Sequence, residues 1–150
     1  MGDLLRNKGL TLSAAESCTG GLVSDRITNI SGSSDYFLGS AVTYSNEAKR
    51  DVLGVSEASL KKYGAVSEQV AKEMALGCRK TFGSDIGIST TGIAGPTGGS
   101  KEKPVGLVWF AVADGQTIVA EKEIFSGDRI DIKNDAAMHA INMVINFLRK

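Results

Sequence analysis

The sequence has few of the residues that bind metals or form disulfides. Its 150 residues hold one histidine, His139, and two cysteines, Cys18 and Cys78. Two cysteines without CxxC spacing form neither a disulfide framework nor a metal-ligand set, and are typical of small buried side chains in a reducing compartment. Because histidine is so scarce and the carboxylates are scattered, we expect no metal site. His139 falls in a C-terminal helical pattern, where we expect a structural role.

Net charge and long apolar runs are also missing. Lys plus Arg and Asp plus Glu number 17 each, so the net charge is zero, which argues against a general nucleic-acid binder. No apolar run approaches the ~20 residues that span a bilayer, and Met1 to Leu10 are too polar and too short for a signal peptide. We therefore expect a soluble cytoplasmic protein with no membrane partner, in which residues 1–150 form one domain.

Hydrophobic periodicity and turn signals predict an α/β fold. Strands are expected at 10–15, 37–44 and 86–91, followed by a hairpin of strands 105–113 and 117–125 around Asp114-Gly115. Helices are expected before Gly9 and at 20–30, 48–53, 56–63, 67–82 and 128–150. Because the first three strands alternate with helices, they should be parallel. The result is a mixed, mostly parallel five-stranded sheet with helices on both faces.

Polar residues follow the carboxyl end of each of the first three strands. Ser17 comes after the first strand, Lys49 after the second, and Thr91 and Gly92 after the third. The last strand of the hairpin returns Arg129 to the same edge. Ligands of open α/β sheets bind at this edge, so the sequence predicts a functional site there.

Ser17 is a candidate nucleophile that needs a base. The only histidine is far away in the sequence, which leaves Lys49, and lysine is a base only when it is neutral. Its ordinary pKa of about 10.4 must fall to roughly 7 to 8, through burial or through a nearby cation such as Arg50 or Lys103. Other interpretations stay open: Ser17 as a helix N-cap, Lys49 as a solvated lysine, or Cys18 as the nucleophile.

Neighbouring residues allow several roles. Glu16 can orient a base, cap a backbone N–H or face solvent. The segment Thr19-Gly20-Gly21, at a helix start, can present N–H groups to an oxyanion or a phosphate. The loop 92–99 has neither the Walker ending nor GxGxxG spacing; it holds a phosphate or is a flexible turn. Arg129 is either a phosphate ligand or an exposed residue at a helix start.

Six ordered motifs carry a resemblance to a known family. They are Ala15-Glu16-Ser17-Cys18-Thr19-Gly20-Gly21, Thr43-Tyr44-Ser45-Asn46-Glu47-Ala48-Lys49, Gly64-Ala65-Val66-Ser67, Gly92-Ile93-Ala94-Gly95-Pro96-Thr97-Gly98-Gly99, Lys103-Pro104-Val105-Gly106 and Gly127-Asp128-Arg129. Together they resemble the CinA C-terminal (competence/damage-inducible) family, the nicotinamide-nucleotide amidases, over nearly the whole chain. The chain is similar to the stand-alone form of that family, although it begins closer to the first strand than we expect.

The resemblance implies a three-layer α/β/α sandwich and an activity. The expected reaction is hydrolysis of nicotinamide mononucleotide to nicotinate mononucleotide and ammonia, by a serine–lysine pair that the motifs place at Ser17 and Lys49, with no cofactor. The candidate substrate-binding residues are Thr19, Gly20, Gly21, Tyr44, Asn46, Thr91, Gly92, Gly95 and Arg129. The rival interpretations are a non-catalytic nucleotide-binding module in competence or DNA-damage responses, and an amidase for another substrate. The apolar final helix and the strand edges are compatible with a homo-oligomer.

Overall fold

The computed structural model describes all 150 residues, from Met1 to Lys150. Its helices are α1 (Gly2–Lys8), α2 (Leu22–Thr28), α3 (Asn46–Leu53), α4 (Glu57–Tyr63), α5 (Glu68–Phe82) and α6 (Arg129–Leu148), with a short 3₁₀ turn at Ser33–Asp35. Its strands are β1 (Leu12–Glu16), β2 (Phe37–Val42), β3 (Ile86–Gly92), β4 (Leu107–Ala113) and β5 (Ile118–Ile124). Every expected element is present, and the boundaries differ by a few residues at most.

The strands form one sheet in the order β2-β1-β3-β4-β5. β1 pairs in parallel with β2 and β3, whereas β4 is antiparallel to both β3 and β5. Only β4 therefore runs against the other strands, which confirms the mixed, mostly parallel sheet. Glu16 at the end of β1 lies opposite Val42 in β2 and Thr90 in β3, so the carboxyl ends of these three strands reach the same edge.

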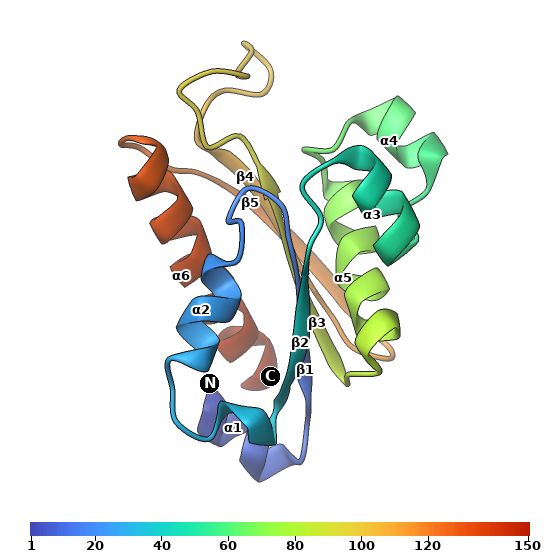
Figure 1. Ribbon diagram of the computed structural model, residues 1–150, viewed down its shortest axis with the longest axis vertical. Coiled ribbons are helices and arrows are strands. Elements are labelled where there is room, and N and C mark those ends of the chain that lie inside the picture. The colour runs from blue at the N-terminus through green and yellow to red at the C-terminus, as the bar shows by residue number, and fades with distance from the viewer.

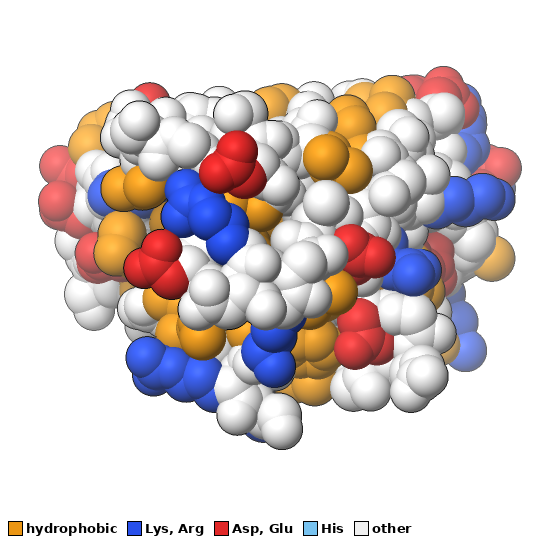
Figure 2. Space-filling model, turned by 90° about the horizontal axis from the view of Figure 1, so that it is seen from below, with side chains coloured by type: hydrophobic (Ala, Val, Ile, Leu, Met, Phe, Trp, Pro, Cys, Tyr) orange, Lys and Arg blue, Asp and Glu red, His pale blue; other side chains and the backbone are white.

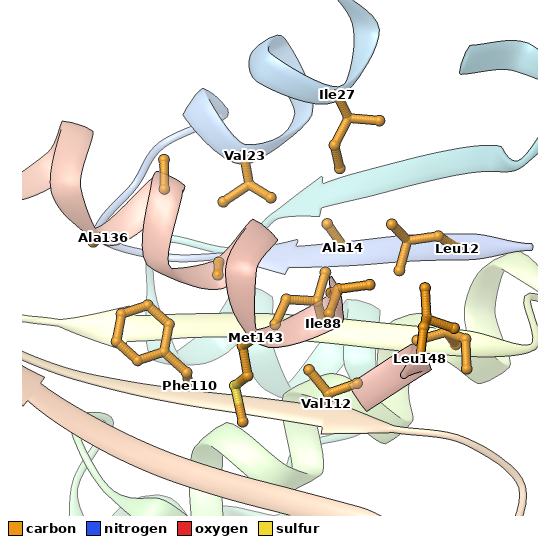
Figure 3. Close-up of a cluster of buried hydrophobic side chains, with 14 of the residues drawn as sticks. Leu12, Ala14, Val23, Ile27, Ile88, Phe110, Val112, Ala136, Met143 and Leu148 are labelled. Atoms are coloured by element: carbon orange, nitrogen blue, oxygen red, sulfur yellow. The ribbon is translucent and has the colours of Figure 1, made fainter. Parts of the chain in front are cut away.

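Helices cover both faces of the sheet, as expected for a three-layer sandwich. In Figure 1, α2 and α6 lie on one side of the sheet, and α3, α4 and α5 lie on the other. The larger core fills the α2/α6 side, where β1, β3 and β4 turn alternate apolar side chains toward the helices. Figure 3 shows side chains of this core, among them Leu12, Ala14, Val23, Ile88, Phe110 and Met143. A smaller core, around Val70, Met74 and Cys78, joins α5 to the opposite face.

Side-chain caps fix where most helices begin. Ser45, Ser56 and Ser67 each accept a backbone N–H at the start of α3, α4 and α5, and Asp128 forms a capping box with Asp131 at α6. Two expectations were wrong in detail. Because Ser45 caps α3, this helix begins at 46 rather than 48, and Lys49 lies in its first turn. α2 spans Leu22–Thr28 rather than 20–30.

The surface and the helices fit the balanced composition. Figure 2 shows a face on which acidic and basic side chains are interspersed, with apolar side chains between them. None of the six helices combines the length and the apolar character that crossing a bilayer requires.

Candidate active site

A buried lysine contacts a serine at the carboxyl edge of the parallel strands. Ser17 directly follows β1, and Lys49 projects from the first turn of α3. The Lys49 Nζ lies 2.9 Å from the Ser17 Oγ. Only 1% of Lys49 and 8% of Ser17 are exposed. The strand order thus brings Ser17 and Lys49 together, as expected. The burial of Lys49 excludes the alternative of a solvated lysine.

The lysine has no acidic partner. Its Nζ donates to the carbonyl oxygens of Thr43, at 2.9 Å, and Tyr44, at 3.1 Å. Burial lowers the pKa of Lys49 to about 8, while the neighbouring Cys18 opposes this shift. Removal from water disfavours the charged form of an amine. With this pKa, part of the Lys49 population is uncharged near physiological pH, and the uncharged amine can act as a base.

The two cations proposed as the cause of this shift do not cause it. Arg50 pairs with Asp51 at 2.7 Å, and Lys103 donates to the carbonyl oxygen of Tyr63 at 2.6 Å. No cation contributes to the lowered Lys49 pKa. Of the two causes considered, burial and a nearby cation, burial therefore accounts for the lowered pKa of Lys49.

Cys18 is not activated as a nucleophile. Its side chain is buried, and burial raises the pKa of the thiol to about 12. The thiolate is the nucleophilic form of cysteine, so Cys18 is a neutral thiol at physiological pH. The geometry favours Ser17 over Cys18.

Glu16 caps the helix that follows the serine. The carboxylate accepts the backbone N–H groups of Gly21, Val23 and Ser24 at 2.9 to 3.1 Å. This is the capping role among the three considered for Glu16. Ser17 is not an N-cap: α2 begins after Gly21 without any hydroxyl cap. Its Oγ is therefore free to face Lys49.

A cavity of about 210 Å³ opens beside the serine and the lysine. It is lined by Ser17, Cys18, Tyr44, Lys49, Ala65, Val66, Thr91, Gly92, Ala94 and Arg129. Arg129 joins Tyr44 to the loop 92–99, because Nη1 donates to the carbonyl oxygen of Gly95 at 2.6 Å and Nη2 donates to the Tyr44 hydroxyl at 3.1 Å. Gly95 itself, a predicted substrate residue, does not line the cavity. No carboxylate lines this cavity, so it favours neutral or anionic ligands.

Some predicted substrate residues lie away from this cavity. The Thr19 side chain is fully buried and bonds to Glu16 and Thr90, so it does not face a ligand. Asn46 lines a separate hollow with Arg50. The Gly20 and Gly21 amides donate to Ser17 and Glu16. The sequence of a glycine-rich helix start does not show which of its N–H groups already donate to other atoms of the chain. Nor does the sequence distinguish an asparagine that faces solvent at a helix start from one that faces a ligand.

The sequence analysis gave no individual role to four residues near the site. Ala65, Val66 and Ala94 form apolar cavity walls, and no chemical signal distinguishes such residues from ordinary core. The Lys133 Nζ lies 3.5 Å from the position that a Cβ on Gly20 would take, at the outer end of the Ser17–Gly20 turn. No group of three or more histidine, cysteine, aspartate or glutamate side chains converges to hold a metal ion.

The fold and the site define a class: an α/β/α sandwich that places a serine and a buried lysine in contact at the carboxyl edge of its parallel strands. Comparison with known proteins is more specific. The family profile of the CinA C-terminal domain matches residues 1–148. This chain therefore belongs to the CinA C-terminal domain family.

Relatives of two lengths are similar to this chain. A protein of Enterobacter agglomerans named nicotinamide-nucleotide amidohydrolase PncC is 51% identical over 147 residues, which cover 97% of this chain and 89% of that protein. A putative competence-damage inducible protein of Thermoanaerobacter pseudethanolicus is 50% identical over 97% of this chain. The chain spans about a third of that longer relative, 35% of its length.

Solved structures share the fold along the whole chain. The competence damage-inducible protein A of Klebsiella pneumoniae superposes with a TM-score of 0.95 at 34% identity, covering 99% of this chain and 92% of that one. The competence/damage inducible protein CihA of Agrobacterium tumefaciens gives a TM-score of 0.92 at 39% identity, covering 99% and 94%. These similarities confirm the family and the α/β sandwich.

Proposed function

We propose that this chain hydrolyses the carboxamide of nicotinamide mononucleotide, releasing ammonia and nicotinate mononucleotide, with Ser17 as nucleophile and Lys49 as base. The observation that carries the proposal is the 2.9 Å contact between the Ser17 Oγ and a lysine Nζ that is almost fully buried. The name of the similar Enterobacter agglomerans protein supports the reaction class and the substrate.

The carbonyl partners of Lys49 suit a neutral amine. A neutral Nζ carries two hydrogens and one lone pair. Thr43 and Tyr44 accept two N–H bonds, which leaves the lone pair for the third neighbour, the Ser17 hydroxyl. Lys49 then takes the Ser17 proton while Oγ attacks the amide carbon. The protonated amine next donates that proton to the leaving nitrogen, so ammonia departs and an ester remains on Ser17. Water, activated by the same lysine, cleaves this ester and releases the acid.

One backbone amide, that of Cys18, is available for the oxyanion. The N–H groups of Cys18 and Thr19 donate to no acceptor within the chain, whereas those of Ser17 and Gly20 donate to Thr90 and Ser17. Ser17 and Cys18 both line the cavity, whereas Thr19 is completely buried. A free donor directly after a nucleophile can stabilise the charge that develops on the amide oxygen. The oxyanion donor that we propose is therefore the Cys18 N–H, rather than an N–H group of Thr19, Gly20 or Gly21.

The walls of the cavity suit a flat ring attached to an anionic group. Ala65, Val66 and Ala94 offer apolar contacts, and the exposed Tyr44 ring stands at the opening. Arg129 supplies a fixed guanidinium at the same opening, and guanidinium groups bind phosphate strongly. We assign the nicotinamide ring to the apolar walls and the phosphate to the Arg129 side, together with the neighbouring loop 92–99.

Ammonia release tests this function. Purified protein is incubated with nicotinamide mononucleotide, nicotinamide riboside and nicotinamide, and both ammonia and the acid product are quantified. We expect turnover of the nucleotide, and a loss of at least about a thousandfold in Ser17→Ala and Lys49→Met. The controls Ser34→Ala and Lys72→Met, at positions that do not line the cavity, should keep full activity.

Three results would contradict the proposal in different ways. Retained activity in either site variant would remove the serine–lysine pair. Equal hydrolysis of the phosphate-free amides would indicate an amidase for another substrate. Tight nucleotide binding without ammonia release would favour the non-catalytic binding module.

A further inference from the structure

Glu16 and Ser17 are sequence neighbours that serve opposite faces of the sheet. Successive side chains of a strand point to opposite sides. Ser17 points toward α3, where it meets Lys49, and Glu16 points toward α2. The Glu16 side chain is completely buried although it carries a carboxyl group. The proposed reaction gives this side chain no role, so its burial calls for an explanation.

The Glu16 carboxylate holds a dense set of hydrogen bonds. Oε2 accepts from the Thr19 hydroxyl at 2.7 Å, the Gly21 N–H at 2.9 Å and the Val23 N–H at 3.1 Å. Oε1 accepts from the N–H and the hydroxyl of Ser24, at 2.9 and 2.6 Å. No basic side chain pairs with it. The Ser40 hydroxyl lies farther away, at 3.4 Å from Oε1. A carboxylate only accepts hydrogen bonds, so Glu16 suits a position that is surrounded by donors.

These bonds fix both ends of the segment that follows β1. At one end, the Ser17 N–H donates to the Thr90 carbonyl at 3.0 Å. At the other end, Thr19 bonds to Glu16 and to the Thr90 hydroxyl, and the Gly21 N–H is held by Glu16. The Gly20 N–H closes the turn onto the Ser17 carbonyl at 3.2 Å. The Cys18 and Thr19 amides have no acceptor in the chain, and of these two residues only Cys18 lines the cavity.

We propose that Glu16 is a positioning residue for the reaction. It acts through Thr19 and the start of α2 to hold the Ser17–Gly20 turn, so that the Ser17 Oγ faces Lys49 while the Cys18 N–H faces the reacting carbonyl. This proposal rests on the proposed function for its substrate, but the claim about the turn stands on the contacts alone.

A matched control separates positioning from stability. Glu73 also clamps the start of a short helix, since it accepts the Ser56 N–H at 2.7 Å and the Ser59 hydroxyl at 2.5 Å at α4, and it does not line the cavity. We expect both Glu16→Gln and Glu73→Gln to lower the melting temperature, because an amide group replaces an acceptor oxygen among donors. Only Glu16→Gln should lower kcat, by about a hundredfold with KM changed less than threefold, as expected when oxyanion donors are misplaced.

Thr19 gives a milder second test in case Glu16→Gln does not fold. Thr19→Ser keeps the hydroxyl that links Glu16 to Thr90 and should keep kcat within about threefold. Thr19→Val keeps the shape but removes the hydroxyl, and kcat should fall at least tenfold. A kcat that is kept in Thr19→Ser and lost in Thr19→Val would support the positioning role of Glu16. Equal kcat in the two variants, or a fall of kcat in Glu73→Gln equal to that in Glu16→Gln, would overturn it.

Labelling of Ser17 distinguishes failure of this proposal from failure of the proposed function. With a fluorophosphonate probe, the Ser17 Oγ bonds to phosphorus, fluoride leaves and Lys49 takes the proton, so no amide substrate is needed. Mass spectrometry follows the rate at Ser17. Slower labelling in Glu16→Gln than in Glu73→Gln supports positioning even if the nucleotide is not hydrolysed. Equal rates, or an unlabelled Ser17 in the unaltered protein, would overturn it.

Discussion

The burial of Lys49 predicts how amide hydrolysis depends on pH. The pKa of Lys49 is lowered to about 8 by burial, and the neutral amine is the active form. With that pKa, about one lysine in ten is neutral at pH 7 and about nine in ten at pH 9. We therefore expect kcat/KM to rise about tenfold between pH 7 and 9 and then to level off.

A single buried charge should move this profile. Cys18 is buried beside Lys49 and lines the same cavity. Cys18→Asp would place a carboxylate there, and an opposite charge within a few ångströms raises the pKa of a lysine by about 1 to 3 pH units. The midpoint of the profile should then move upward from about 8 by at least about one unit. Cys18→Asn has the same shape without the charge and should leave the midpoint in place.

The assay is quantification of nicotinate mononucleotide by chromatography from pH 6 to 10. Circular dichroism at each pH shows that the protein stays folded. A rate that climbs about a hundredfold between pH 7 and 9, and does not level off before pH 10, would mean that Lys49 has an ordinary pKa, and the reasoning from burial would fail. Equal midpoints in the Asp and Asn variants would show that Lys49 is not the titrating base.

Further predictions concern stability, substrate binding and the nucleophile. Lys49 has a folded pKa of about 8, below the ordinary 10.5, so the unfolded state binds more protons between these values and stability rises with pH. Urea unfolding should show the unaltered protein gaining about 2 to 3 kcal/mol relative to Lys49→Met between pH 7 and pH 10, with no relative change below pH 7. Arg129→Ala should raise KM for the nucleotide about ten- to a hundredfold and change KM for nicotinamide riboside far less, in steady-state kinetics. Cys18→Ala should keep kcat within about fivefold, whereas a loss as large as that in Ser17→Ala would make the thiol the nucleophile. Gly87→Ala should lower the free energy of unfolding by about 1 to 3 kcal/mol, measured by denaturation, because the added Cβ would lie 2.1 Å from the Ala75 carbonyl oxygen.

The sequence predicted the fold and the meeting of Ser17 with Lys49 for the same reason. Alternating helices and strands dictate parallel strands, and parallel strands bring their carboxyl ends to one edge. Residues that follow different strands then lie close together. This reasoning needs only the order of the elements, so it tolerates the error of two residues in the start of α3.

The directions of individual side chains could not be predicted from the sequence. Thr19 was expected at the ligand but turns into the sheet toward Glu16 and Thr90. The burial of Lys49, which sets its pKa, depends on how the segments around it pack together. Glu16 caps residues five to eight positions later, farther than the local capping patterns that a sequence shows. Such features depend on tertiary packing rather than on local pattern.

The ester on Ser17 is the most direct test of the proposed reaction. The protein is mixed with nicotinamide mononucleotide, quenched in acid within one turnover and digested, and the peptide that contains Ser17 is examined by tandem mass spectrometry. We expect this peptide to gain the mass of the nucleotide minus ammonia, with the added mass on Ser17, and to gain nothing in Ser17→Ala. An adduct on Cys18, or product formation with no adduct at any time point, would contradict a serine nucleophile activated by a buried neutral lysine.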